Sequence, residues 1–119
     1  MANPNIVNVT TINGNTAVQQ VTTSATAIVS NAAASGKIYK INAIVVSNVD
    51  AANAALLTVD LYRSSTAYRL IYNLSIGINS AYTPIDKSLC LYLLEGDSIR
   101  LTASVNSRLE AVATWEEIS

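Results

Sequence analysis

The alternation of apolar and polar side chains predicts short β-strands throughout this chain. Residues 98–104 and 56–63 alternate cleanly, with the two-residue period of a strand that buries one face. Turn-forming residues separate nine segments of this kind: residues 6–11, 16–23, 26–30, 37–48, 56–63, 68–74, 88–94, 98–104 and 109–118. No segment has the length of a crossover helix. We therefore expect an all-β fold, an antiparallel β-sandwich of eight or nine strands that is jelly-roll-like.

Residues 88–104 predict a β-hairpin on which the rest of the chain is organised. Two apolar runs, SLCLYLL and SIRLTAS, flank Glu95, Gly96 and Asp97. A glycine that tolerates positive φ suits such a turn, and we expect the two acids at its solvated tip. The first run is apolar on both faces, so a loop, a second sheet or a neighbouring subunit must cover its second face.

Asparagine, glycine and proline predict the remaining turns. The Asn-Gly-Asn sequence at residues 13–15 favours a tight turn that pairs residues 6–11 with residues 16–23. The alanine-rich residues 49–55 are too short for a stable helix, so we expect a loop there. Pro84 lacks an N–H donor, which favours a crossing loop over a central strand.

The faces of two segments follow from the same period. In residues 37–48 the odd positions from Tyr39 to Val45 share one face, and Ile44 and Val46 later oppose them. This strand is expected to begin half-exposed and to end buried on both sides. A turn at residues 64–66 is expected to join residues 56–63 and 68–74 in a second hairpin. In the last strand the predicted inward residues are Leu109, Ala111, Ala113 and Trp115.

Length and composition favour one charge-poor domain. The 119 residues divide into an N-terminal arm with the first strand, residues 1–12, and a single β-sandwich domain, residues 13–119. Half of the residues are apolar and only 13% are charged, which is typical of a chain with protein neighbours. The net charge is −1 without a basic cluster, so we expect no nucleic-acid partner. No apolar run approaches the ~18 residues of a membrane span, so no membrane partner is expected.

Catalytic and metal chemistry finds little support in the residue types. The chain has no histidine, the commonest general base and metal ligand, and its single Cys90 excludes an internal disulfide. Glu95 and Asp97 are alternatively an acid/base pair or calcium ligands, but a solvated turn is favoured. We predict no catalytic residue, no cofactor and no metal site.

Three stretches carry a family resemblance. GKIYKINAIVVSNVDAANAALLTVDLYR at residues 36–63, LCLYLLEGDSIRLTAS at residues 89–104 and the acidic end WEEIS resemble small virion proteins of tailed bacteriophages. The resemblance implies a jelly-roll-like capsid decoration (cement) protein, made in the bacterial host cytoplasm, that binds across neighbouring shell subunits. It also implies the major capsid protein or other virion proteins as partners, and a homo-oligomer, with a trimer favoured.

Two alternatives to capsid decoration remain open at this point. One is a small tail or baseplate component, and the other is a receptor- or carbohydrate-binding module at a fibre tip. The second would use exposed tyrosines, whose rings stack on sugars. A small enzyme is the least favoured reading.

Six residues are the candidate interaction site. The arm preceding the first turn is expected to dock onto a neighbouring subunit by strand addition. Tyr62 lies opposite the inward leucines of its strand, which makes it an interface anchor, and Tyr92 lies on the second apolar face of residues 88–94. The predicted interaction residues are Asn3, Asn5, Ile6, Val7, Tyr62 and Tyr92.

Overall fold

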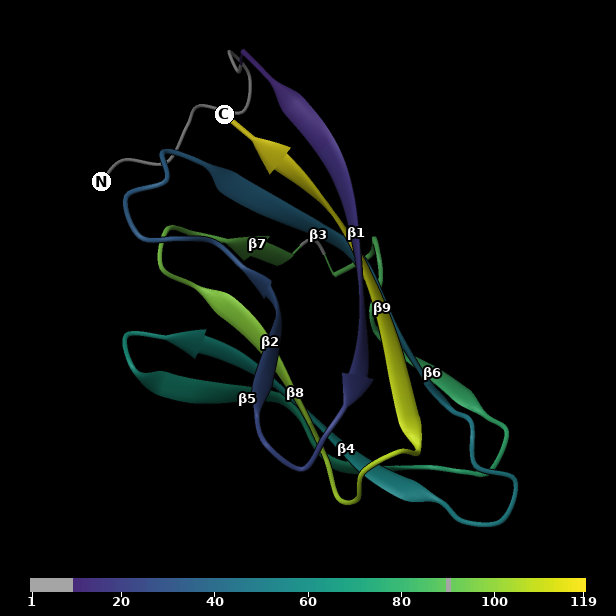
Figure 1. The fold of residues 1–119 in the computed structure, drawn as a ribbon. Helices are drawn as coiled ribbons and strands as arrows, with labels where there is room; N and C mark the ends of the chain where they lie inside the picture. The colour runs from purple at the N-terminus through teal and green to yellow at the C-terminus, as the bar shows by residue number, and fades with distance from the viewer. Residues whose placement is uncertain (1–9, 90) are drawn as a thin grey trace.

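The computed structural model describes residues 10–89 and 91–119, which form two antiparallel sheets packed face to face (Figure 1). The strands are β1 (Ile12–Val21), β2 (Thr26–Ser30), β3 (Ile38–Asn48), β4 (Ala55–Arg63), β5 (Thr66–Ile76), β6 (Ala81–Ile85), β7 (Leu91–Leu93), β8 (Ser98–Ala103) and β9 (Leu109–Ile118). Sheet A has the order β1-β9-β3-β6, with β7 also paired to β3, and sheet B has the order β2-β8-β4-β5. The predicted all-β antiparallel sandwich is confirmed.

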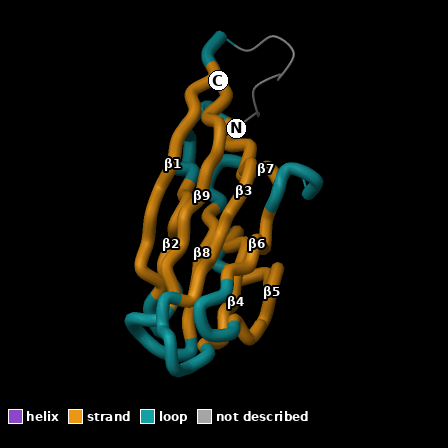
Figure 2. Tube along the Cα trace, turned by 90° about the vertical axis from the view of Figure 1, so that its right-hand side faces the viewer, coloured by secondary structure: helices purple, strands orange, loops and turns teal. Residues whose placement is uncertain are grey.

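The strand order is that of a jelly roll. Leaving β7 aside, each sheet holds four strands, and most connections pass from one sheet to the other. Among the described strands only β4 and β5 form a hairpin, which confirms the predicted turn at residues 64–66. Figure 2 shows the strands running along the long axis of the molecule, with loops gathered at its ends.

The core lies between the two sheets and consists of branched aliphatic side chains. Alternation along each strand supplies them, because every second residue points inward. Leu109, Ala111 and Ala113 of β9 are buried, and Trp115 packs against the core, as predicted. The largest fully buried residues are Val21, Val29, Ile41, Ile44, Val46, Leu57, Val59, Ile85, Leu93, Ile99, Leu101 and Leu109.

The predicted hairpin at residues 88–104 is wrong. Its first arm, β7, pairs with β3 in sheet A, and its second arm, β8, pairs with β2 and β4 in sheet B. Residues 94–97 therefore carry the chain between the sheets. Leu93 is buried in the core, as a two-sided apolar run requires, whereas Leu89 is exposed. Local turn propensity is satisfied equally by a hairpin and by a crossing between layers, so it does not decide the partner strand.

The predicted turn at residues 13–15 is also wrong. β1 runs through this sequence without a break, and Gly14 pairs with Glu116 of β9. The Asn15 side-chain amide donates to Glu117 Oε2 over 2.9 Å. A continuous ladder with β9 outweighs the weak local preference for a turn. Thr10 and Thr11 precede the strand, and the rest of the predicted strand at residues 6–11 lies outside the described residues.

A bulge changes the faces of β3. The register with β9 shifts between Ile41 and Ala43, so Ile41, Ile44 and Val46 point inward and Val45 is exposed. The expectation of a two-sided buried end is therefore wrong.

The segment around Pro84 forms a strand, β6, contrary to the expected loop. β6 lies at the edge of sheet A, where a proline is tolerated. Residues 49–54 form a loop, as predicted.

Candidate functional site

Asp97 is a buried structural group, which corrects the expected solvated tip. Only 2% of its side chain is exposed, and it accepts hydrogen bonds from Arg63 Nε at 2.8 Å and from the Leu94 N–H at 2.9 Å. A second bond from Arg63 makes the pair bidentate. Hydrogen bonding to Asp97 raises the pKa of Arg63 above its ordinary value. This ion pair ties the end of β4 to the crossing between β7 and β8.

Hydrogen bonds of Glu95 and of two asparagines join loops at the ends of the sandwich. Glu95 Oε2 accepts the Gly36 N–H at 2.7 Å, and buried Asn31 donates to the carbonyls of Lys37 and Leu93. These contacts join the two loops at one end of the molecule. Both acids therefore hold structural hydrogen bonds, Glu95 to the backbone and Asp97 to the backbone and Arg63.

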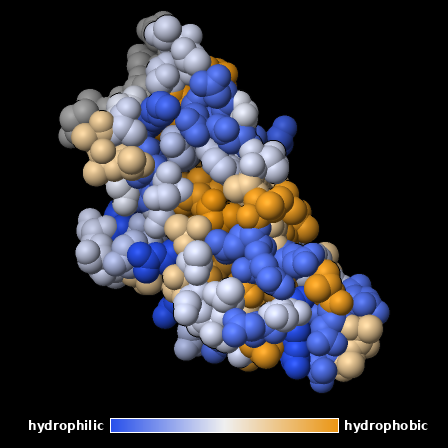
Figure 3. Space-filling view, in the orientation of Figure 1, coloured by the Kyte–Doolittle hydropathy of each residue, from blue (hydrophilic) through white to orange (hydrophobic). Residues whose placement is uncertain are grey.

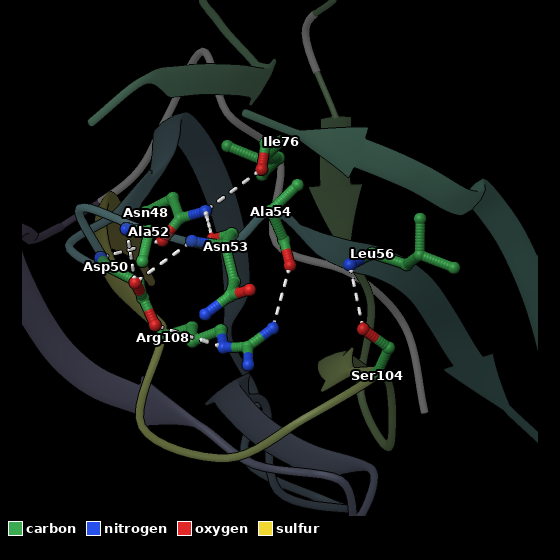
Figure 4. A network of polar contacts seen from close by, with 9 residues as sticks. All are labelled: Asn48, Asp50, Ala52, Asn53, Ala54, Leu56, Ile76, Ser104 and Arg108. Atoms are coloured by element: carbon green, nitrogen blue, oxygen red, sulfur yellow. Dashed lines mark hydrogen bonds and ion pairs between the residues drawn. The ribbon is translucent and has the colours of Figure 1, made fainter. Parts of the chain in front are cut away.

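Asn48 makes similar contacts in the loop at the opposite end of the sandwich. Figure 4 shows its hydrogen bonds to the surrounding residues. Its side-chain amide donates to the Asn53 and Ile76 carbonyls at 3.0 Å each, and its oxygen accepts the Asp50 N–H. Asp50 also pairs with Arg108 at 3.2 Å. Hydrogen bonds from the Ala52 backbone lower the pKa of Asp50 below its ordinary value. The loop at residues 49–54 is therefore ordered by side chains rather than by apolar packing.

Three valines form an apolar row, the valine row, across the outer face of sheet A. Val18 of β1 and Val45 of β3 both lie opposite Val112 of β9, so the three side chains share one face in adjacent strands. All three are exposed, Val18 to 77%. A shallow hollow of ≈ 390 Å³ lies over β1 and β9 beside this row. Figure 3 shows hydrophobic surface near the middle of the molecule, in the region of these strands.

The outer face of sheet B is aromatic and cationic instead. The Arg100 guanidinium lies 3.4 Å from the centre of the Tyr62 ring, and that of Arg69 lies 5.1 Å from Tyr72. Arg69 also donates to both carboxylate oxygens of buried Asp60 at 2.8 Å. Arginine and tyrosine are, with tryptophan, the side chains most enriched at binding hot spots. This face is therefore a second candidate surface.

The structure separates the predicted interaction residues. Tyr62 is half-buried under Arg100 in sheet B, and Tyr92 is half-buried in sheet A, opposite Lys40 of β3. The two tyrosines therefore do not form one site. Asn3, Asn5, Ile6 and Val7 lie outside the described residues, as does Cys90.

The valine row is the feature that sequence reasoning missed. Val18 and Val112 stand alone among small and polar residues, so neither run looks like an interface in the sequence. Only the strand register brings them together with Val45. Alternation alone gave one usable signal, the outward position of Val112 between the inward residues of β9.

Within residues 10–89 and 91–119, no three His, Cys, Asp or Glu side chains are grouped to hold a metal ion. The same part of the chain contains no helix long and apolar enough to cross a membrane. Neither a protein-family model nor a curated protein matches the chain.

Proposed function

We propose that this chain is a structural virion protein that decorates a bacteriophage capsid and binds across neighbouring shell subunits. The observation that carries the proposal is the exposed valine row on the outer face of sheet A. The resemblance of residues 36–63 and 89–104 to small virion proteins supplies the biological setting. The partners are then the major capsid protein or other virion proteins, on a homo-oligomer that the resemblance favours as a trimer.

The valine row supports a binding role because it is flat, contiguous and neutral. Singly exposed apolar residues are ordinary, but three in register across β1, β9 and β3 form one strip. The neighbouring rows carry mostly small or neutral polar side chains, with Glu110 the one acid beside the strip. A rigid sheet presents such a strip without the ordering cost that a flexible loop would add.

The test of this proposal measures the chain in purified particles. We expect hundreds of copies per virion by quantitative mass spectrometry, and added protein should bind particles that lack it. Val112→Lys should abolish that binding, because it places a charge in the middle of the strip. Ala67→Lys, an exposed strand position in sheet B, is the matched control and should bind normally. Absence of the chain from virions would overturn the proposal, and a few copies would indicate a tail or baseplate component.

A second candidate function is a fibre-tip module that binds receptors or carbohydrates. Tyr72, exposed to 65%, and Tyr68, exposed to 55%, favour it, because exposed rings on a strand edge suit sugar stacking. Binding of the isolated protein to a glycan array, lost in Tyr72→Ala but kept in Val112→Lys, would support this function over capsid decoration.

A further inference from the structure

We propose that β1 pairs in antiparallel fashion with β1 of a second copy, across a two-fold axis. This pairing joins the five-stranded sheet A of each copy into one continuous sheet. The inference concerns the chain in solution and does not depend on the proposed capsid partner. It makes a dimer, and so differs from the trimer that the resemblance favours.

Each of the other edge strands in the described part of the chain is short or carries a device that discourages pairing. β7, which pairs with β3 beside β6, is only three residues long. β6 has Pro84 and a bulge opposite β3, and β2 is only five residues long with a bulge of its own. β5 has register shifts, a left-handed residue at Asn73 and the charge of Arg69. Bulges, prolines, charges and short length are the means by which proteins protect sheet edges.

β1 has none of these devices. Its sequence INGNTAVQQV contains no charge and no proline, and its register with β9 runs unbroken from Ile12 to Val21. Because β1 is uncharged, two copies meet there without electrostatic repulsion. A second copy therefore fits β1 better than any other edge.

The hydrogen bonds between β1 and the end of the chain show which backbone N–H and C=O groups of β1 point away from β9. Thr11 and Ser119 exchange both backbone bonds, at 3.0 and 2.9 Å, so they form a hydrogen-bonded pair of the antiparallel ladder. Pairs alternate along such a ladder. The odd-numbered residues of β1 thus bond to β9, and the even-numbered residues point their N–H and C=O groups away from it. In the described part of the chain, no backbone bond outside the ladders uses residues 12–20.

Side chains and charges select one register, in which Val18 lies opposite Val18 of the second copy. Val18 carries free backbone groups and lies on the outer face, so the two valine rows then become one row of six. A register centred on Ala17 would instead place Glu110 of one copy in the same row as Glu116 of the other, through Gln20 and Gly14. A register centred on Thr16 would place Val18 opposite Gly14 of the second copy, so the two valine rows would not join.

Cross-linking tests this register. In a Cys90→Ser background, Val18→Cys should be captured as a dimer by a short bismaleimide, because hydrogen-bonded partners lie about 5.5 Å apart between Cα atoms. Thr16→Cys is the matched control: its counterpart is offset by four residues, about 14 Å along the strand. It should give at least tenfold less cross-linked dimer. Equal or greater cross-linking through Thr16 would overturn the register.

Sedimentation tests the dimer itself. The wild-type protein should sediment at twice the 12.6 kDa of one chain. Thr16→Pro removes an N–H that faces the free edge, so it should yield a monomer whose ladder with β9 is intact. Wild-type protein that is monomeric or trimeric at high micromolar concentration would refute the pairing, and so would a Thr16→Pro dimer. Should Thr16→Pro fail to fold, the Val18 and Thr16 cross-links decide the matter alone. A dimer that does not bind capsids would support this inference and contradict the proposed function.

Discussion

The ion pair between Arg63 and Asp97 predicts an unequal response to removal of its two charges. Asp97 is 2% exposed and Arg63 is 42% exposed. Arg63→Met leaves a buried carboxylate that still accepts the hydrogen bond from the Leu94 backbone N–H but has lost its counter-charge. Asp97→Asn leaves a guanidinium that can turn into water. The loss of the arginine should therefore cost more stability than the loss of the acid.

The magnitudes follow from burial and from the hydrogen bonds in the structure. Breaking a buried pair on the arginine side typically costs about 3–5 kcal/mol, because the carboxylate stays in the interior without its counter-charge. The amide introduced by Asp97→Asn would keep one acceptor oxygen, which satisfies either Leu94 or Arg63 but not both, so this substitution should cost about 2 kcal/mol. In the double variant no charge is stranded. It should therefore be more stable than Arg63→Met alone, although it carries one more substitution.

Equilibrium urea unfolding at one fixed protein concentration measures these differences. With a slope of about 2 kcal/mol per molar urea, Arg63→Met should lower the midpoint by about 2 M. Lys37→Met is the control, because its partner Glu117 is 20% exposed, whereas Asp97 is 2% exposed, so this pair should contribute less than about 1 kcal/mol. A double variant less stable than Arg63→Met would refute the reasoning, as would changes no larger than the control.

Three further predictions concern the backbone and the end loops. Gly14→Thr should raise stability by about 0.5–1 kcal/mol, because a Cβ there meets nothing and glycine weakens a strand, whereas Gly96→Thr should lower it since Gly96 has φ +87°; thermal unfolding of both variants checks this. Asn48→Ala should cost about 2–4 kcal/mol in urea unfolding, because it removes the donor to the buried Ile76 carbonyl and to the partly buried Asn53 carbonyl. The folded pKa of Asp50 is lowered from 3.8, so its ionised form adds stability above that pH, which is lost as pH falls through the lowered value. Asp50→Asn should therefore flatten the acid side of the stability profile, and an unchanged profile would contradict the assignment.

Sequence patterns predicted single strands better than they predicted partners. Alternation located β4, β8 and β9 and most of their inward residues, because that signal depends only on which face is buried. The turn signals at residues 13–15 and 95–97 were read as hairpins, and both readings were wrong. An Asn-Gly-Asn or Glu-Gly-Asp sequence records local backbone preference, but the partner of a strand is set by contacts distant in the chain.

The candidate surfaces show the same limit, because a surface shared by several strands depends on how those strands pair. Tyr62 was predicted to face outward, and its outward position under Arg100 on sheet B agrees with that prediction. The valine row was not predicted, because its three residues are separated by long stretches of sequence. The bulge of β3 turns Val45 outward, and no residue of that strand predicts the bulge.

The sequence by itself determined the class of fold, the absence of a histidine-based site and the charge-poor composition, since these depend on residue types and on a local period. Tertiary structure alone decided that Asp97 is buried, that β7 and β8 belong to different sheets and that Val18, Val45 and Val112 form one row. The physical reason is that an exposed and a buried carboxylate look alike in a sequence. Burial arises only when layers pack, and packing depends on pairings between residues that are far apart along the chain.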